Sequence, residues 1–255
     1  MSTPIMQGAE PISITDGTRG GVLLLHGYTA TVQQVRDWAL AFAQAGYAVE
    51  APLLPGHGTS VDEMVSTTWS DYMRSADESY RKLAARHQHI LVGGLCLGGN
   101  IAASLAMKYP TETAGLIVIN SPFKSPGNGN PEVWKQILGT GKQFFTWSTA
   151  PKFVEDPQAP AVLSYNKVPI APMTSLYDAL TEQRQRLNEI RCPVLVFTSL
   201  HDTSNSSNDS RPWLEEVSGP AEQLVLENSN HVATFDYDKV LLEARSIEFA
   251  HAVVG

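Results

Sequence analysis

The stretch from Ile90 to Asn100, ILVGGLCLGGN, constrains the fold of this 255-residue chain more than any other. A short apolar run leads into Gly94-x-Cys96-x-Gly98, and a helical pattern of small residues follows until Pro110 stops it. A strand that turns sharply into a helix strains the backbone of its central residue, so the flanking positions must be small. The pattern therefore predicts a strand–turn–helix that presents Cys96 as a nucleophile, at a position where serine is usual.

The rest of the chain alternates short apolar runs, bounded by turn residues, with apolar residues at helical spacing. This alternation predicts consecutive βαβ units, because each apolar run is the signature of a strand buried on both faces. We therefore expect an α/β fold with a mostly parallel open sheet flanked by helices. The expected strands are 21–25, 47–51, 89–93, 115–119, 194–198 and 223–226, and the expected helices include 32–45, 69–83 and 98–109.

The segment between Pro122 and about Leu187 interrupts the alternation. It shows no clean strand pattern, while prolines and aromatic residues cluster in it. Such a length is too great for a simple loop in a compact domain. We expect an inserted helical cap at 122–187, within a core formed by 1–121 and 188–255. The alternative is ordinary helical packing at the sheet edge, and the sequence favours neither.

Composition excludes several functional classes. Eighteen Lys and Arg against 26 Asp and Glu give a net charge of −8 with no basic run, so a nucleic-acid partner is not expected. No apolar run approaches the roughly 18 residues of a membrane span, and the N-terminus lacks a secretory signal pattern, which predicts a cytoplasmic protein. Cys96 and Cys192 form neither a disulfide nor a zinc pattern, and the glycines lack the lysine of a phosphate loop. We expect no metal and no cofactor; the sequence specifies no oligomeric state.

A nucleophile on such a turn needs an acid, a base and donors for an oxyanion, and all have candidates. Asp202 follows the strand at 194–198 and His231 follows the strand at 223–226, which is the order acid then histidine after the nucleophile. Both lie at carboxyl ends of strands, where open α/β sheets place ligand-facing residues. The proposed oxyanion donors are the backbone N–H groups of Tyr28 and Leu97. Asp209 is the nearest rival acid.

Several segments in the correct order resemble the bacterial carboxylesterase and monoacylglycerol-lipase branch of the α/β-hydrolase superfamily, over nearly the whole chain. They are LLLHGYTAT, AGYAVEAPLLPGHGTS, TTWSDY, VGGLCLGGNIAASLAMKYP, GLIVINSP, CPVLVFTSLHD and ENSNHVATFDYDK. The resemblance implies the α/β-hydrolase fold, with Cys96 as nucleophile, Asp202 as acid and His231 as base. It also implies that Tyr28 and Leu97 supply the oxyanion hole.

Two features depart from that family. The family has serine where this chain has Cys96, and an apolar-proline segment commonly follows its acid where this chain has TSNSSN at 203–208. A thiol at a helix N-terminus beside a histidine is expected to be partly ionised, so it can attack an acyl carbon without the base help that serine needs. However, sulfur is larger than oxygen, so an oxyanion hole shaped for serine fits its adduct less well.

The leading hypothesis is an enzyme that acts on an acyl ester or thioester through a Cys96–His231–Asp202 triad and an acyl-enzyme. The alternative is an acyltransferase, or a lyase that eliminates a carboxylate such as acetate from an O-acylated metabolite. A third hypothesis is a binding module without catalysis, in which Cys96 only packs. A serine replaced by an experimenter would give the same sequence. Cys192 is expected to pack, and His26 and His57 to form loop hydrogen bonds.

Overall fold

The computed structural model describes residues 3–123, 131–146, 152–205 and 207–254. Seven strands form one sheet, in the order β1-β3-β2-β4-β5-β8-β9. Every neighbouring pair is parallel except β1 and β3, which run antiparallel at one edge. The elements are β1 (Ile12–Ile14), β2 (Gly21–Leu25), α1 (Gln33–Gln44), β3 (Ala48–Ala51), α2 (Val61–Met64), α3 (Trp69–Ala84), β4 (Ile90–Leu95), α4 (Leu97–Lys108), β5 (Thr113–Ile119), α5 (Pro131–Gly139), β6 (Phe144–Thr146), β7 (Lys167–Pro169), α6 (Ile170–Arg184), β8 (Val194–Ser199), α7 (Arg211–Glu215), β9 (Ala221–Leu226) and α8 (Lys239–Val254).

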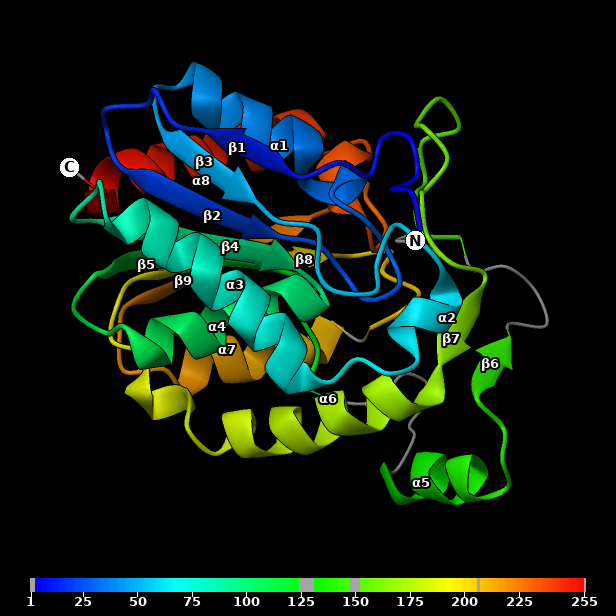
Figure 1. Cartoon of the computed structure of the whole chain (residues 1–255). Coiled ribbons are helices and arrows are strands. Elements are labelled where there is room, and N and C mark those ends of the chain that lie inside the picture. Colours follow the sequence, from blue (N-terminus) through cyan, green and yellow to red (C-terminus); the bar gives the residue numbers. More distant parts are fainter. Residues whose placement is uncertain (1–2, 124–130, 147–151, 206, 255) are drawn as a thin grey trace.

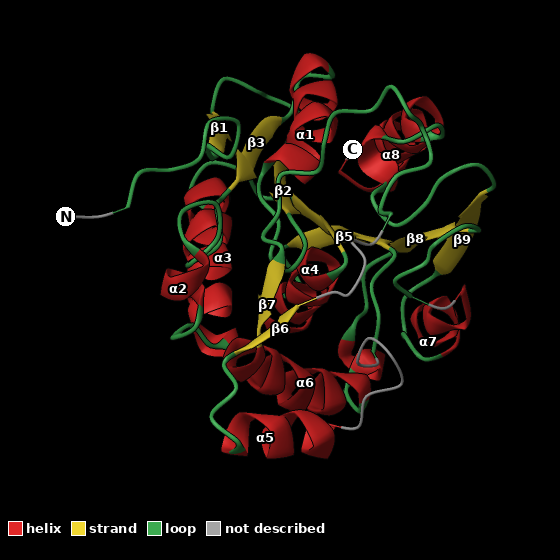
Figure 2. Cartoon of the chain, turned by 90° about the vertical axis from the view of Figure 1, so that its right-hand side faces the viewer, coloured by secondary structure: helices red, strands yellow, loops and turns green. Residues whose placement is uncertain are grey.

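Helices cover both faces of the sheet, which explains why its central strands are apolar throughout. Figure 2 shows α1 and α8 on one face and α3, α4 and α7 on the other. All residues of β2, β4 and β8 are buried, and the core divides into two apolar clusters, one on each side of the sheet. A parallel sheet with both faces covered is what the alternating pattern predicts, and the expected fold class is confirmed.

The strand order reverses direction between β2 and β4. From β2 the chain crosses to β3 on one side, and then to β4 on the other, so the carboxyl ends of β2 and β4 border a topological switch point. Figure 1 shows these two strands ending at the same side of the molecule. Loops that follow β2 and β4 are thereby brought together, and open α/β sheets bind their ligands at such a place.

Some elements differ from the sequence-based expectation. The edge strand β1 was not expected, and β4 extends two residues beyond the predicted 89–93, up to the turn at Cys96. The expectation of no strand in 122–187 is wrong, because β6 and β7 pair there as an antiparallel ribbon. Strands of three residues show almost no periodicity, so a sequence pattern cannot reveal them.

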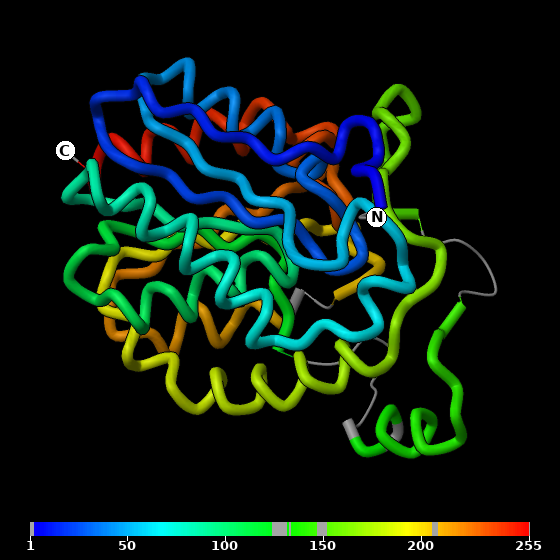
Figure 3. The backbone as a smooth tube through the Cα atoms, viewed as in Figure 1, coloured from blue at the N-terminus to red at the C-terminus, as the bar shows by residue number. Residues whose placement is uncertain are grey.

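The described parts of the segment 122–187 lie partly beside the carboxyl ends of the strands and partly, in α5 and α6, below α4 in the view of Figure 2. Figure 3 shows the chain from 152 to 169 on the same side of the molecule as the ends of β2 and β4. The helix α6 packs against α3 and α5. Parts of the expected cap, residues 124–130 and 147–151, lie outside the described residues. Among the residues that are described, no helix combines the length and apolarity that crossing a membrane requires.

Candidate active site

Cys96 occupies a sharp turn between β4 and α4. Its φ of 54° lies in the left-handed region that non-glycine residues rarely adopt, and it is the N-cap residue of α4. A Cβ on Gly94 would lie 2.2 Å from the carbonyl carbon of Gly98, and a Cβ on Gly98 would lie 2.0 Å from the carbonyl oxygen of Leu25. Glycine is therefore required at both positions, because strand, helix and the neighbouring strand approach each other by their backbones.

The two predicted oxyanion donors flank Cys96. Leu97 begins α4, and Tyr28 lies in the loop after β2, which is the strand paired with β4. A Cβ on Gly27 would lie 3.5 Å from the Cβ of Cys96, so this loop passes directly beside the nucleophile position. The Gly27 N–H donates to the side chain of Gln34 over 2.9 Å, which fixes the loop to α1. Neither the Tyr28 N–H nor the Leu97 N–H donates to another described residue.

His231 and Asp202 meet beside Cys96 from two separate loops. The Nδ1 atom of His231 lies 3.0 Å from Oδ2 of Asp202, and the two side chains are only 7% and 4% exposed. The other carboxylate oxygen of Asp202 accepts the backbone N–H groups of Ser204 (2.7 Å) and Asn205 (3.0 Å). Cys96 lies close enough to His231 for its side chain to raise the pKa of the ring. The structure thus brings together the three side chains that the sequence singled out.

The charges around His231 determine its protonation. Burial of the ring favours the neutral form, but the negative charges of Asp202 and Cys96 and their hydrogen bonds outweigh it and raise the pKa of His231 to about 10. The imidazolium can donate from Nδ1 to Asp202 while it faces the sulfur of Cys96. This arrangement places a buried proton donor beside the sulfur of Cys96.

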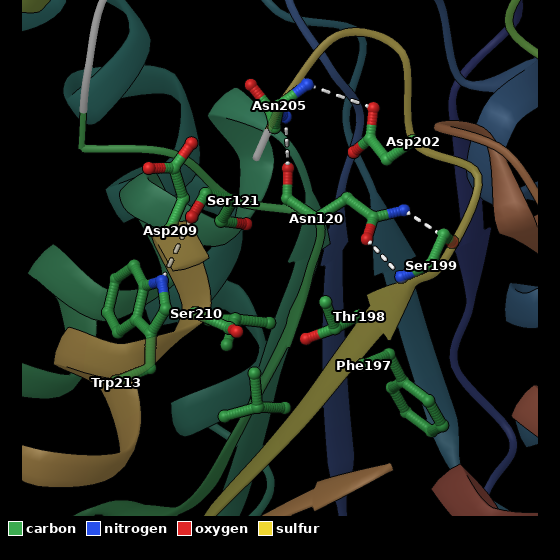
Figure 4. Close-up of a pocket in the computed structure, with 12 residues that line it drawn as sticks. Asn120, Ser121, Phe197, Thr198, Ser199, Asp202, Asn205, Asp209, Ser210 and Trp213 are labelled. Atoms are coloured by element: carbon green, nitrogen blue, oxygen red, sulfur yellow. Dashed lines mark hydrogen bonds between the residues drawn. The ribbon is translucent and has the colours of Figure 1, made fainter. Parts of the chain in front are cut away.

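Asn120, at the carboxyl end of β5, connects both histidine and acid to the sheet. Its side-chain amide donates to the hydroxyl of Ser199 and to the carbonyl oxygen of His231, each over 2.9 Å, and its Oδ1 accepts the Ser199 N–H. The side chain of Asn205 donates to the Asn120 carbonyl oxygen over 2.8 Å and lies 3.4 Å from Nδ1 of His231. Figure 4 shows the bonds of Asn120 with Ser199 and with Asn205. Sequence reasoning missed Asn120; a polar residue ending a buried strand was the available signal.

Asp236 fixes the histidine loop to the segment after residue 152. Its two carboxylate oxygens accept four backbone N–H groups, from Asn230, Glu155, Asp156 and Tyr237, at 2.8 to 2.9 Å. The side chain is 4% exposed. Four donors around one buried carboxylate form a rigid junction, because each bond is shortened and strengthened by the charge. No pattern in the sequence indicates this role.

The same junction places an aromatic ring against His231. The Phe153 carbonyl oxygen accepts the N–H of Val232 over 2.9 Å, and the Phe153 ring centre lies 6.0 Å from that of His231. Phe153 belongs to the segment that the sequence assigns to a cap. The catalytic histidine candidate is therefore covered by this segment as well as by its own loop.

Two candidates weighed from the sequence lie apart from this pair. Asp209 is placed beside Trp213 at the start of α7, across a small cavity of about 10 Å³ from Asp202 (Figure 4). It is Asp202 that contacts His231. Cys192 is buried, and burial raises the pKa of its thiol to about 12, so it stays protonated and packs as a small apolar residue.

His26 and His57 are buried beneath the loop that carries Tyr28. In His26, Nδ1 donates to the Gly27 carbonyl oxygen over 2.9 Å and Nε2 accepts the Leu54 N–H over 3.1 Å. In His57, Nδ1 donates to the Pro55 carbonyl oxygen, and Nε2 has no partner among the described residues. Burial lowers the pKa of His26 to about 4 and of His57 to about 3, so both rings are neutral. They are structural histidines that connect loops.

Comparisons with known proteins agree with the fold. The sequence pattern of the hydrolase family described as serine aminopeptidase, S33, matches residues 16–238. A thermostable monoacylglycerol lipase from Bacillus sp. (strain H-257) is 34% identical over 96% of each chain, and a carboxylesterase from Bacillus subtilis (strain 168) is 25% identical over 94% of this chain and 95% of its own.

Solved structures share the fold over the same length. A structure from work on LipS and LipT, two metagenome-derived lipolytic enzymes, has a TM-score of 0.90 and 29% identity, covering 98% of this chain and all of that one. The monoacylglycerol lipase of Paleococcus ferrophilus has a TM-score of 0.79 at 19% identity, over 94% of this chain and 96% of its own, which supports the fold alone. The chain therefore belongs to the serine aminopeptidase S33 family of α/β-hydrolases, among the ester hydrolases of lipase and esterase type.

Proposed function

We propose that the protein hydrolyses carboxylic esters through a thioester on Cys96. The observation that carries the proposal is the meeting of Cys96, His231 and Asp202 beside two backbone N–H groups that have no acceptor among the described residues. In this proposal Cys96 is the nucleophile, His231 moves the proton and Asp202 orients the ring. The N–H groups of Tyr28 and Leu97 bind the oxyanion.

In the first half-reaction, the Cys96 thiolate attacks the ester carbonyl carbon, and the carbonyl oxygen becomes an oxyanion. Collapse of this adduct expels the alcohol, whose oxygen takes the proton from the His231 imidazolium. Cys96 now carries the acyl group, and the negative charge that raised the pKa of His231 from the sulfur side is gone. The neutral ring then takes a proton from water, which attacks the thioester. Release of the carboxylic acid restores the thiolate and the imidazolium.

We propose further that residues 122–187 form a cap that shapes the acyl pocket. The helix α6 buries apolar side chains against the core, and aromatic residues from the described part of the segment join the same apolar cluster. The apolar cap residues are Ile170, Met173, Leu176, Tyr177, Trp134, Phe145 and Tyr165. Apolar side chains in this segment suit contact with a hydrocarbon chain, so the proposed substrate class is an ester with an apolar acyl group. The 34% identical relative, a monoacylglycerol lipase, makes monoacylglycerols the first natural esters to test.

Intact-mass spectrometry after incubation with p-nitrophenyl acetate tests the nucleophile. We expect one acetyl adduct that maps to Cys96, with p-nitrophenol release, and both should disappear in Cys96→Ala. Cys192→Ala is the matched control, because that thiol is buried and protonated, and its adduct should equal that of the parent. An adduct on another residue, or undiminished release by Cys96→Ala, would refute the triad.

Acyl transfer is a second candidate that one specific feature favours. With sulfur at position 96 the intermediate is a thioester rather than an oxygen ester, and thioesters react readily with acceptors such as amines and thiols. The Cys96→Ser variant gives the comparison on the same scaffold. If added amine diverts the acyl group to an amide far more in the parent than in Cys96→Ser, transfer is part of the function. Equal partition would leave hydrolysis as the reaction.

A further inference from the structure

The loop that carries Tyr28 is bonded to the cap segment at three places. The Tyr28 hydroxyl donates to the carbonyl oxygen of Pro169 over 2.8 Å, and the Tyr165 N–H donates to the carbonyl oxygen of Thr29 over 3.0 Å. The Gln33 side chain accepts the N–H of residue 163 over 2.7 Å and donates to the carbonyl of residue 161 over 3.0 Å. All these partners lie more than 125 residues away in the sequence.

Thr29, directly after Tyr28, has a strained backbone. Its φ is 60°, in the left-handed region, and a β-branched residue is among the least suited to that conformation. The local turn contributes a single long bond, from the Ala30 N–H to the Gly27 carbonyl oxygen at 3.4 Å. Such strain persists where surrounding contacts hold it. Here, those contacts come from the cap segment on either side of the strained peptide.

We propose that the cap braces the oxyanion hole, and that the side chain of Tyr28 is a positioning residue whose hydroxyl, through Pro169, keeps the backbone N–H of Tyr28 in place. Pro169 is the N-cap residue of α6, so the brace connects the start of the cap helix to the donor beside Cys96. This inference rests on the proposed oxyanion role of the Tyr28 N–H. It adds a role for the tyrosine hydroxyl and for the strain at Thr29.

The brace has a direct consequence for catalysis. Without the hydroxyl, the strained loop relaxes toward ordinary backbone geometry and carries its N–H away from the oxyanion position. Removing one oxyanion donor outright typically costs about 100- to 1,000-fold in kcat, so a displaced donor should cost less. The loss falls on kcat rather than KM, because the donor acts on charge that develops in the transition state.

A double-mutant cycle between Tyr28→Phe and Thr29→Gly tests the brace. Tyr28→Phe keeps the ring and should lower kcat for p-nitrophenyl butyrate about 10- to 100-fold, with KM changed by less than about 2-fold. Thr29→Gly removes the strain, since glycine adopts positive φ freely. In the Thr29→Gly background, Tyr28→Phe should lower kcat by less than about 3-fold, because the loop no longer needs the brace.

Tyr72→Phe is the matched control. Its hydroxyl bonds to the Thr67 hydroxyl over 2.6 Å and forms no hydrogen bond with the described residues of the cap, and Tyr72 contacts the His57 ring as Tyr28 does. We expect kcat within about 3-fold of the parent. A second measurement is inhibition by an alkyl trifluoromethyl ketone, whose thiol adduct carries an oxyanion. Its inhibition constant should rise for Tyr28→Phe in parallel with the loss in kcat.

The outcomes separate the two proposals. If Tyr28→Phe lowers kcat equally in both backgrounds, or raises only KM, the brace is refuted while ester hydrolysis stands. The same holds if Tyr28→Phe behaves like Tyr72→Phe. If the parent forms no acyl adduct on Cys96, the proposed function fails first. Circular dichroism and thermal unfolding of each variant distinguish a displaced loop from a protein that has not folded.

Discussion

The two halves of the candidate site are positioned by different forces. On the elbow side, which comprises residues 94–98 and the Tyr28 loop, backbones meet without room for a Cβ at Gly94 or Gly98. On the corner side, which comprises residues 202–205 and 228–238, buried polar side chains hold loops through hydrogen bonds. Close packing of backbones tolerates almost no added atom, whereas a hydrogen-bonded loop depends on a few donors and acceptors. We therefore expect the elbow side to be disrupted by any added side-chain atom, and the corner side by the loss of a hydrogen-bond donor or acceptor.

The largest expected effect is that of Gly98→Ala on the elbow. Its Cβ would lie 2.0 Å from a backbone carbonyl oxygen, which cannot move aside as a flexible side chain would. We expect a loss of about 3 kcal/mol or more in the free energy of unfolding, measured by denaturant titration. Gly139→Ala is the control, because nothing lies within 4 Å of the added methyl. If Gly98→Ala and Gly139→Ala have the same free energy of unfolding, close backbone packing does not position the elbow.

The next effect is that of Asp236→Ala on the corner. Four backbone N–H groups lose their acceptor; that of Asn230 is buried and the other three are partly buried. We expect a loss of about 3 kcal/mol in stability, together with a lower kcat, because Asn230 adjoins His231. The exposed Asp16→Ala serves as the control. If Asp236→Ala keeps full activity but loses stability, the hydrogen bonds of Asp236 do not position His231.

Asn120→Asp sharpens the comparison, since it leaves the size of the side chain unchanged and replaces the amide donors by a carboxylate. A carboxylate cannot donate to Ser199 or to the carbonyl of His231, and it brings a further negative charge next to Asp202. We expect about 2 kcal/mol of destabilisation and at least a tenfold loss in kcat. Asn188→Asp, in a turn distant in sequence, is the control. Wild-type kinetics in Asn120→Asp would show that packing, not hydrogen bonding, sets the corner.

The smallest expected effect is on the pH dependence of stability, which should differ between the elbow side and the corner side. His57, beneath the elbow-side loop, has its pKa lowered to about 3, so the folded state resists protonation and stability falls as pH drops below about 6.5. At pH 5.5 the loss is about 1.4 kcal/mol, and His57→Phe should remove it. His231 has its pKa raised to about 10, so its contribution is present at low pH and is lost as pH rises toward 10.

Thermal unfolding measured from pH 8 to 5 gives the acid limb, which is the loss of stability toward low pH. Thermal unfolding measured from pH 7 to 10 gives the alkaline limb, which is the loss of stability toward high pH. The acid limb should be shallower in His57→Phe than in the parent, and the alkaline limb should be shallower in Cys96→Ala, because one of the charges that raise the pKa of His231 is then absent. Identical changes in stability between pH 8 and 5 in His57→Phe and the parent would mean that His57 binds a proton as readily in the folded chain as in the unfolded one, so that its pKa is not lowered by burial.

The sequence predicted the elements whose signals are local. The central strands follow from apolar runs, since each must be buried on both faces, and the elbow follows from glycines two residues either side of Cys96. The three-residue strands β1, β6 and β7 were not predicted, because an alternating pattern of apolar and polar residues cannot be recognised over three residues. The cap boundaries at 122 and 187 and the catalytic roles of the site residues remain predictions.

By itself, the sequence determined the α/β fold and the chemical identity of the nucleophile, acid and base candidates, because burial patterns and residue types are written along the chain. Only the tertiary structure decided what holds them. Asn120 reaches a carbonyl 111 residues away, and the Tyr28 hydroxyl one 141 residues away. Hydrogen bonds between segments so distant in sequence leave no periodic trace, since their geometry exists only once the sheet has brought the loops together.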